Sequence, residues 1–85
     1  MPVLSRFFGI VIFMNWKDHN PPHFHARYGE MKALFDFQGS LIEGNLSPKA
    51  LILVREWAAL HQNDLNNNWE RMQTGKHPLP IQPLE

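Results

Sequence analysis

Three of the chain's five histidines, His19, His23 and His25, lie in one short stretch. From His23 to Tyr28, directly after a double proline, polar and apolar side chains alternate. A period of two is typical of a β-strand with one face on a core and the other face open. The open face then displays His23, His25 and Arg27. Two imidazoles beside a guanidinium on one face suit either chemistry on an anion or the binding of a metal.

The first interpretation of this stretch is a metal site. His23 and His25 are spaced i, i+2 on the expected strand, so both rings lie on the same side. The prolines fold the preceding loop back, which makes His19 or Asp18 the candidate third ligand. The chain has no cysteine, so any metal must be held by histidine and carboxylate ligands. This interpretation predicts a divalent metal bound by His19, His23 and His25, or by a set in which Asp18 replaces His19.

The second interpretation is metal-free cleavage of RNA and requires no cofactor. Imidazoles titrate near pH ~6.5 and can therefore serve as base and acid at neutral pH. Arg27 is expected opposite Lys32, and two like charges without a counter-ion favour an anion. Arg6 is a further cation for the same site. The residues assigned to catalysis on this interpretation are His23, His25, Arg27, Lys32 and Asp36.

A third interpretation assigns no chemistry to these residues. A histidine after two prolines can hydrogen-bond the free carbonyls of the loop. A face of histidine, arginine and aspartate side chains is also suited to docking a partner protein. The alternatives to a catalytic protein are therefore a non-catalytic binding module and a metal-binding protein.

The elements that position these residues follow from turn signals. Gly29-Glu30 fits a two-residue type II′ turn, so residues 23–28 and 31–38 are expected to form a hairpin. This register places His23 opposite Asp36, which could accept a hydrogen bond from the ring. Phe24, Tyr28, Phe35 and Phe37 then lie on the core face. The preceding run, residues 5–16, is apolar on both alternating faces and predicts one strand that is covered on both sides.

The C-terminal half predicts helices. Ser47-Pro48 is a strong helix start, with an N-cap serine and proline at the first helical position. Three consecutive asparagines predict a break near residue 63, and a second helix then ends at Gly75. The expected fold is α+β, with a small, mainly antiparallel sheet of three or four strands and a helix or helix pair packed on its phenylalanine face. Residues 1–46 form the sheet, 47–75 the helices, and 76–85 an extended proline-rich tail.

Length and composition limit the alternatives. The 85 residues allow one domain, and 44% of them are apolar, which is enough for one small core. Such a core gives marginal stability, so a partner chain, for example a second copy in a homodimer, is expected to help complete it. No segment has the length of a signal peptide or membrane span, so a soluble cytoplasmic protein is expected. The net charge is zero, so any phosphate binding must come from a local cluster.

Four segments carry a resemblance to a known family. They are the opening Met-Pro-x-x-x-Arg-Phe-x-Gly, the run from Asp18 to Ala26, the Tyr28-Gly29-Glu30 turn, and Glu56-Trp57-Ala58 with His61. The chain resembles, over essentially its whole length, the short bacterial proteins catalogued as domain of unknown function 4160. The resemblance implies a gene context similar to toxin–antitoxin pairs, with a small partner protein from a neighbouring gene. We therefore expect a toxin-like protein acting on RNA, or alternatively an antitoxin or regulator.

Overall fold

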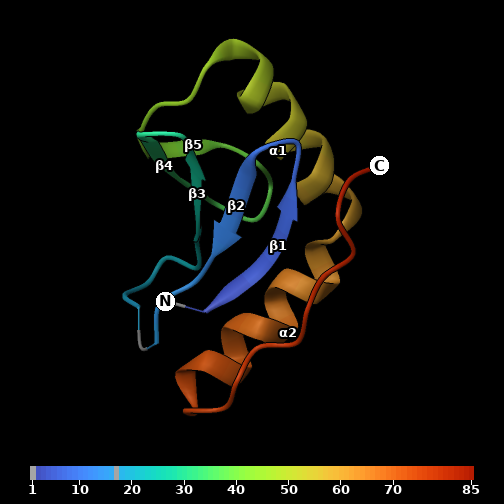
Figure 1. Ribbon diagram of the computed structural model, residues 1–85. Helices are drawn as coiled ribbons and strands as arrows, with labels where there is room; N and C mark the ends of the chain where they lie inside the picture. Colours follow the sequence, from blue (N-terminus) through green and yellow to red (C-terminus); the bar gives the residue numbers. More distant parts are fainter. Residues whose placement is uncertain (1, 17) are drawn as a thin grey trace.

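The N-terminal half of the chain forms one antiparallel sheet (Figure 1). The computed structural model describes residues 2–16 and 18–85. The sheet contains β1 (Val3–Phe7), β2 (Ile10–Phe13), β3 (Phe24–Tyr28), β4 (Met31–Phe35) and β5 (Leu41–Gly44). The strands lie side by side in the order of the sequence, and each pair of neighbours is antiparallel. Two helices follow the sheet, so the α+β class expected from the sequence is confirmed.

The number of strands expected from the sequence was wrong, because residues 5–16 do not form one strand. Phe8 and Gly9 have φ values of 48° and 81° and turn the chain between β1 and β2. Positive φ at both central residues is the property of a type I′ turn. Asparagine or glycine usually occupies the first of these positions, and Phe8 carries no such signal. The turn therefore adds a fifth strand to the three or four that were expected.

The central hairpin has the predicted register. Arg27 pairs with Lys32 and His25 with Leu34, on either side of the turn that begins at Gly29. Gly29 has a φ of 60°, as the first central position of a type II′ turn requires. Because opposed residues share a face, His25, Arg27 and Lys32 lie on the side of the sheet opposite Phe24.

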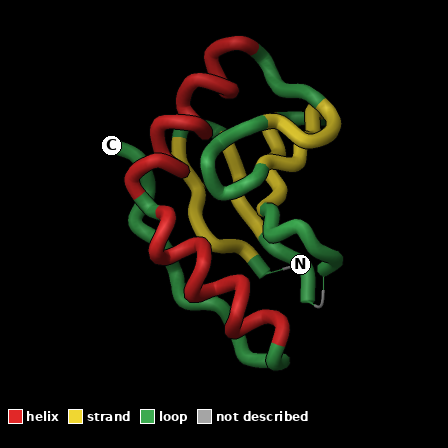
Figure 2. The backbone as a smooth tube through the Cα atoms, turned by 180° about the vertical axis from the view of Figure 1, so that it is seen from behind, coloured by secondary structure: helices red, strands yellow, loops and turns green. Residues whose placement is uncertain are grey.

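Two helices cover the phenylalanine face of the sheet, as expected. Helix α1 (Pro48–Leu60) begins where Ser47 Oγ accepts a hydrogen bond from the amide of Ala50. Helix α2 (Gln62–Gln73) follows after a break at His61. Figures 1 and 2 show the two helices following one another along one side of the sheet. None of the helices in the described part of the chain is long and apolar enough to cross a membrane.

Aromatic side chains join α1 to the sheet. Trp57 is fully buried, and its ring centroid lies 5.7 Å from those of both Phe7 and Phe24. Phe24 in turn stacks on Phe35 of the neighbouring strand at 5.4 Å. The core therefore lies between the sheet and the helices, and no helix of residues 2–16 and 18–85 lies on the opposite face of the sheet (Figures 1 and 2).

The C-terminal tail is held against the rest of the molecule by hydrogen bonds. The buried side chain of Asn68 on α2 donates to the carbonyl of Leu79 and accepts from its amide, both at 2.8 Å. The amide of Ile81 donates to the carbonyl of Leu4 at 2.9 Å. The tail thus supplies a backbone partner to β1 and connects it to α2.

Candidate metal centre and basic sheet face

The loop between β2 and β3 carries the candidate centre. Its two prolines include a cis peptide bond between Asn20 and Pro21. The loop is attached to α2, because Gln73 Nε2 donates a hydrogen bond to the carbonyl of Asp18 at 3.0 Å. Trp69 of the same helix packs on the ring of His23 with a centroid distance of 5.5 Å. The helix therefore holds the loop over the start of β3.

One carboxylate oxygen lies between two imidazoles. Asp18 Oδ2 is 3.3 Å from His23 Nε2 and 3.1 Å from His25 Nε2. The three donor atoms all lie within 4.8 Å of one another. All three side chains are largely withdrawn from solvent, with 10%, 17% and 19% of the His23, His25 and Asp18 side chains exposed. These residues form what we call the His–Asp–His centre.

The ring of His23 has a defined orientation. Its Nδ1 lies 2.9 Å from the carbonyl oxygen of Pro21. A carbonyl only accepts hydrogen bonds, so Nδ1 carries the proton in this contact. The Nε2 atom of the ring then faces Asp18 Oδ2. A proton or a cation shared between these two atoms would make the contact favourable.

The ring of His25 is held by β2. It stacks on Phe13 with a centroid distance of 4.8 Å and an angle of 11° between the planes. Asn15 lies just beyond the end of β2, with its amide nitrogen Nδ2 3.4 Å from His25 Nε2. The backbone amide of Asn15 donates to Asp18 Oδ2, also at 3.4 Å. The end of β2 therefore supports both the histidine and the carboxylate.

A row of cations crosses the open face beside this centre. Across β1 to β4, the opposed residues are Arg6, Val11, Arg27 and Lys32. Arg27 is two residues from His25 on the same face of β3. Arg6, Arg27 and Lys32 form no salt bridge with any residue that the structure describes. We call these three side chains the basic row.

Two of the predicted site residues lie elsewhere. Asp36 does not pair with His23, because β3 begins one residue later and the chain turns at Asp36. Asp36 Oδ1 instead accepts hydrogen bonds from the amides of Gln38 and Ser40, at 3.0 and 2.9 Å. His19 is exposed and is not part of the His–Asp–His centre. Asp18, the alternative to His19 in the sequence, occupies the third position.

The structure also adds residues that sequence reasoning did not identify. Asn15, Trp69 and Gln73 support the centre, and none of them belongs to the histidine-rich stretch. Asn15 gives a weak signal as a polar residue that ends an apolar strand. Trp69 and Gln73 give no signal, because their role depends on how α2 packs against the loop.

Two imidazoles and one carboxylate are a donor set that suits zinc and other first-row transition metals. The bond from His23 to the Pro21 carbonyl is the type of outer contact that orients metal-binding histidines. The basic row supplies charges that suit phosphate groups. The arrangement can therefore place a metal ion next to a bound phosphate.

Comparison with known proteins identifies the family. The model of the family described as "Domain of unknown function (DUF4160)" matches residues 9–70. The matched segment contains the His–Asp–His centre, two residues of the basic row and most of both helices. No curated protein and no solved structure matches the chain. The chain belongs to the DUF4160 family.

Proposed function

For this member of the DUF4160 family, we propose a metal-dependent hydrolase of RNA. The His–Asp–His centre binds a divalent transition metal such as Zn²⁺, and the basic row holds the phosphates of the substrate. The observation that carries the proposal is the shared contact of Asp18 Oδ2 with His23 Nε2 and His25 Nε2, at 3.3 and 3.1 Å.

Two of the three distances between donor atoms in the centre match those around a tetrahedral ion. Zinc binds imidazole nitrogen and carboxylate oxygen at about 2.0–2.1 Å, which places neighbouring ligand atoms about 3.3 Å apart. Both contacts of Asp18 Oδ2 are close to this value. An ion in this position would also place positive charge between His23 Nε2 and the carboxylate. All three donor atoms lie within 4.8 Å of one another, which is close enough for the side chains to converge on one ion.

Three protein ligands leave a coordination position for water, as in catalytic zinc sites. An ion held by Asp18, His23 and His25 would lower the pKa of such a water to about 7 and would so supply a nucleophile for phosphodiester hydrolysis at neutral pH. Arg27, two residues from His25 on the same face of β3, would stabilise the charge that develops on the phosphate.

RNA cleavage would also account for a toxin-like role. An enzyme that cleaves cellular RNA arrests growth, and a partner protein from a neighbouring bacterial gene would then act as the antitoxin. This part of the proposal is supported by the gene context that the family resemblance implies, which is similar to that of toxin–antitoxin pairs. Expression of the protein in a bacterial host, with and without its gene neighbour, tests it. We expect growth arrest that the neighbour relieves.

Metal binding is tested with Co²⁺, whose visible absorption reports tetrahedral coordination. We expect one ion per chain, and at least about tenfold weaker binding in His23→Ala, His25→Ala and Asp18→Asn variants. His61→Ala is the matched control, because His61 Nδ1 also lies 3.3 Å from an aspartate, Asp64, but has no second histidine in that contact. Equal Co²⁺ binding by the His23→Ala, His25→Ala double variant and the unmodified protein would contradict the proposed site.

Catalysis is tested separately with a labelled single-stranded RNA. We expect cleavage that a chelator abolishes and added metal restores, with His19→Ala and Asp36→Ala retaining activity. Cleavage that survives chelation but is lost in the double histidine variant would support metal-free acid–base chemistry instead. Metal binding without cleavage would leave a metal-binding or docking role.

A further inference from the structure

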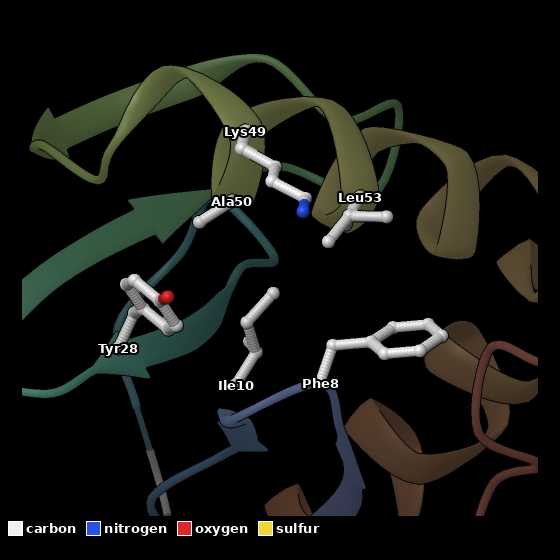
Figure 3. Close-up of a pocket in the computed structure, with 6 residues that line it drawn as sticks. All are labelled: Phe8, Ile10, Tyr28, Lys49, Ala50 and Leu53. Carbon is white, nitrogen blue, oxygen red and sulfur yellow. The ribbon is translucent and has the colours of Figure 1, made fainter.

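A small cavity lies on the helix side of the molecule, at the end of the sheet that carries the β1–β2 turn. Its volume is about 240 Å³. Figure 3 shows the side chains around it, which come from the β1–β2 turn, β2, β3 and α1. They are Phe8, Ile10, Tyr28, Lys49, Ala50 and Leu53. None of these belongs to the His–Asp–His centre or to the basic row.

The walls of the cavity continue into an exposed apolar surface. Phe8 is 60% exposed and Tyr28 is 40% exposed. Large apolar side chains that gather around a hollow on a small protein mark an interaction site. The exposed area extends beyond the cavity, so a ligand that filled only the hollow would leave much of it uncovered.

Phe8 is an unusual residue for its backbone position. It has a φ of 48° at the first central position of a type I′ turn, where asparagine, aspartate and glycine are preferred. Its side chain is too exposed to contribute much to the core. Phenylalanine at this position therefore does not stabilise the turn, whereas it gives a binding surface a large aromatic contact.

Lys49 indicates that the ligand carries a negative charge. Its ammonium group is directed over the cavity (Figure 3) and forms no salt bridge with the residues that the structure describes. The hydroxyl of Tyr28 adds a second polar group at the rim. An apolar cavity with one cation at its edge is complementary to an apolar group next to a carboxylate.

We infer that this cavity docks a segment of a partner protein in which a large apolar side chain is followed or preceded by an acidic residue. The apolar side chain enters the cavity, and the carboxylate pairs with Lys49. The volume is below the roughly 300–1,000 Å³ of pockets that hold drug-sized ligands, and it suits a single anchoring side chain. A peptide also covers the exposed parts of Phe8 and Tyr28, which a small acid does not.

Synthetic peptides and backbone amide NMR of the whole protein test this inference. The first peptide has a central Leu flanked by Glu residues, the second replaces Leu with Ala, and the third replaces Glu with Lys. We expect only the first to shift the amide signals of Tyr28, Lys49 and Leu53. Phenylacetate alone is the small-molecule comparison, and we expect it to bind at least about tenfold more weakly than the first peptide.

Two variants make the result specific. Phe8→Asn suits the turn and should keep the fold intact, while Lys49→Glu reverses the charge at the rim. We expect each variant to bind the acidic peptide at least about tenfold more weakly than the unmodified protein does. Leu60→Ala removes an equally exposed side chain at the other end of α1 and should leave binding unchanged. Unchanged binding in Phe8→Asn, no binding by any peptide, or phenylacetate binding as tightly as the peptide would each overturn the inference.

Discussion

Two aspartates near the histidines show how a carboxylate's role depends on the donors around it. Asp18 Oδ2 is approached by two imidazole nitrogens and by the amide of Asn15, so it belongs to a centre that attracts positive charge. Asp36 Oδ1 is approached by two backbone amides, so it stabilises the turn that leads from β4 to β5. The same residue type therefore belongs to a candidate metal centre at one position and to local structure at the other.

The role of Asp36 leads to a prediction. Asp36→Ala should lower the free energy of unfolding by about 1–2 kcal/mol, because the amides of Gln38 and Ser40 lose their acceptor. Urea denaturation measures this change. The affinity for Co²⁺ should stay within about twofold of that of the unmodified protein, since Asp36 does not contact the His–Asp–His centre. Loss of metal binding together with unchanged stability would show instead that the Asp36 carboxylate contributes to the His–Asp–His centre and not to the turn.

Among the elements, α1 connects the sheet to the tail. Trp57 packs on Phe7 and Phe24, and its Nε1 donates a hydrogen bond to the carbonyl of Gln82 at 3.0 Å. A single side chain thus links β1, β3 and the C-terminal tail. The position of α1 also determines the wall of the cavity that Lys49 and Leu53 line.

We predict that Trp57→Ala lowers the free energy of unfolding by about 3–5 kcal/mol, because a fully buried aromatic side chain is lost from the core. Trp57→Phe keeps most of the packing and removes only the hydrogen bond to Gln82, so it should lower the free energy of unfolding by less than Trp57→Ala does. Thermal and urea denaturation of the two variants separate packing from hydrogen bonding. A melting midpoint close to that of the unmodified protein for Trp57→Ala would mean that α1 does not pack on the sheet as described.

At the scale of the whole molecule, the distribution of charge matters more than its sum. The net charge is zero, with eight basic and eight acidic residues. The sheet nevertheless gathers Arg6, Arg27 and Lys32 in one row on the face without helices. A nucleic acid that binds this face is therefore attracted locally, although the protein as a whole has no excess of charge.

Binding of RNA to the basic row predicts a specific dependence on salt. Three phosphate contacts with a single strand give a slope of about −2 for the logarithm of the affinity against the logarithm of the salt concentration. Arg27→Ala removes one of these contacts and should make the slope shallower by about 0.7. Lys76→Ala, which removes an exposed cation from the tail, should leave the slope unchanged. Fluorescence anisotropy with a labelled single-stranded RNA measures it, and a slope near zero would contradict the basic row as the binding surface.

The sequence by itself determined the features that depend on neighbouring residues. Gly29-Glu30 defined the central turn, and the alternation around it was enough to predict the register and the two faces of the hairpin. Ser47-Pro48 likewise placed the start of α1. These predictions were correct because a type II′ turn, a period of two and an N-cap are each specified by residues that are close in the chain.

Only the tertiary structure decided where the loop carrying Asp18 lies. Gln73 contacts the Asp18 carbonyl across 55 residues of sequence, and Trp69 packs on His23 from the same helix. The sequence therefore offered Asp36 as the residue opposite His23 and left His19 and Asp18 as alternative third ligands, whereas the packing of α2 selects Asp18. The turn at Phe8 was missed for a related reason, since no local signal there favours a positive φ. A loop's path and a disfavoured backbone angle are both stabilised by contacts from distant parts of the chain, and such contacts exist only once the molecule has folded.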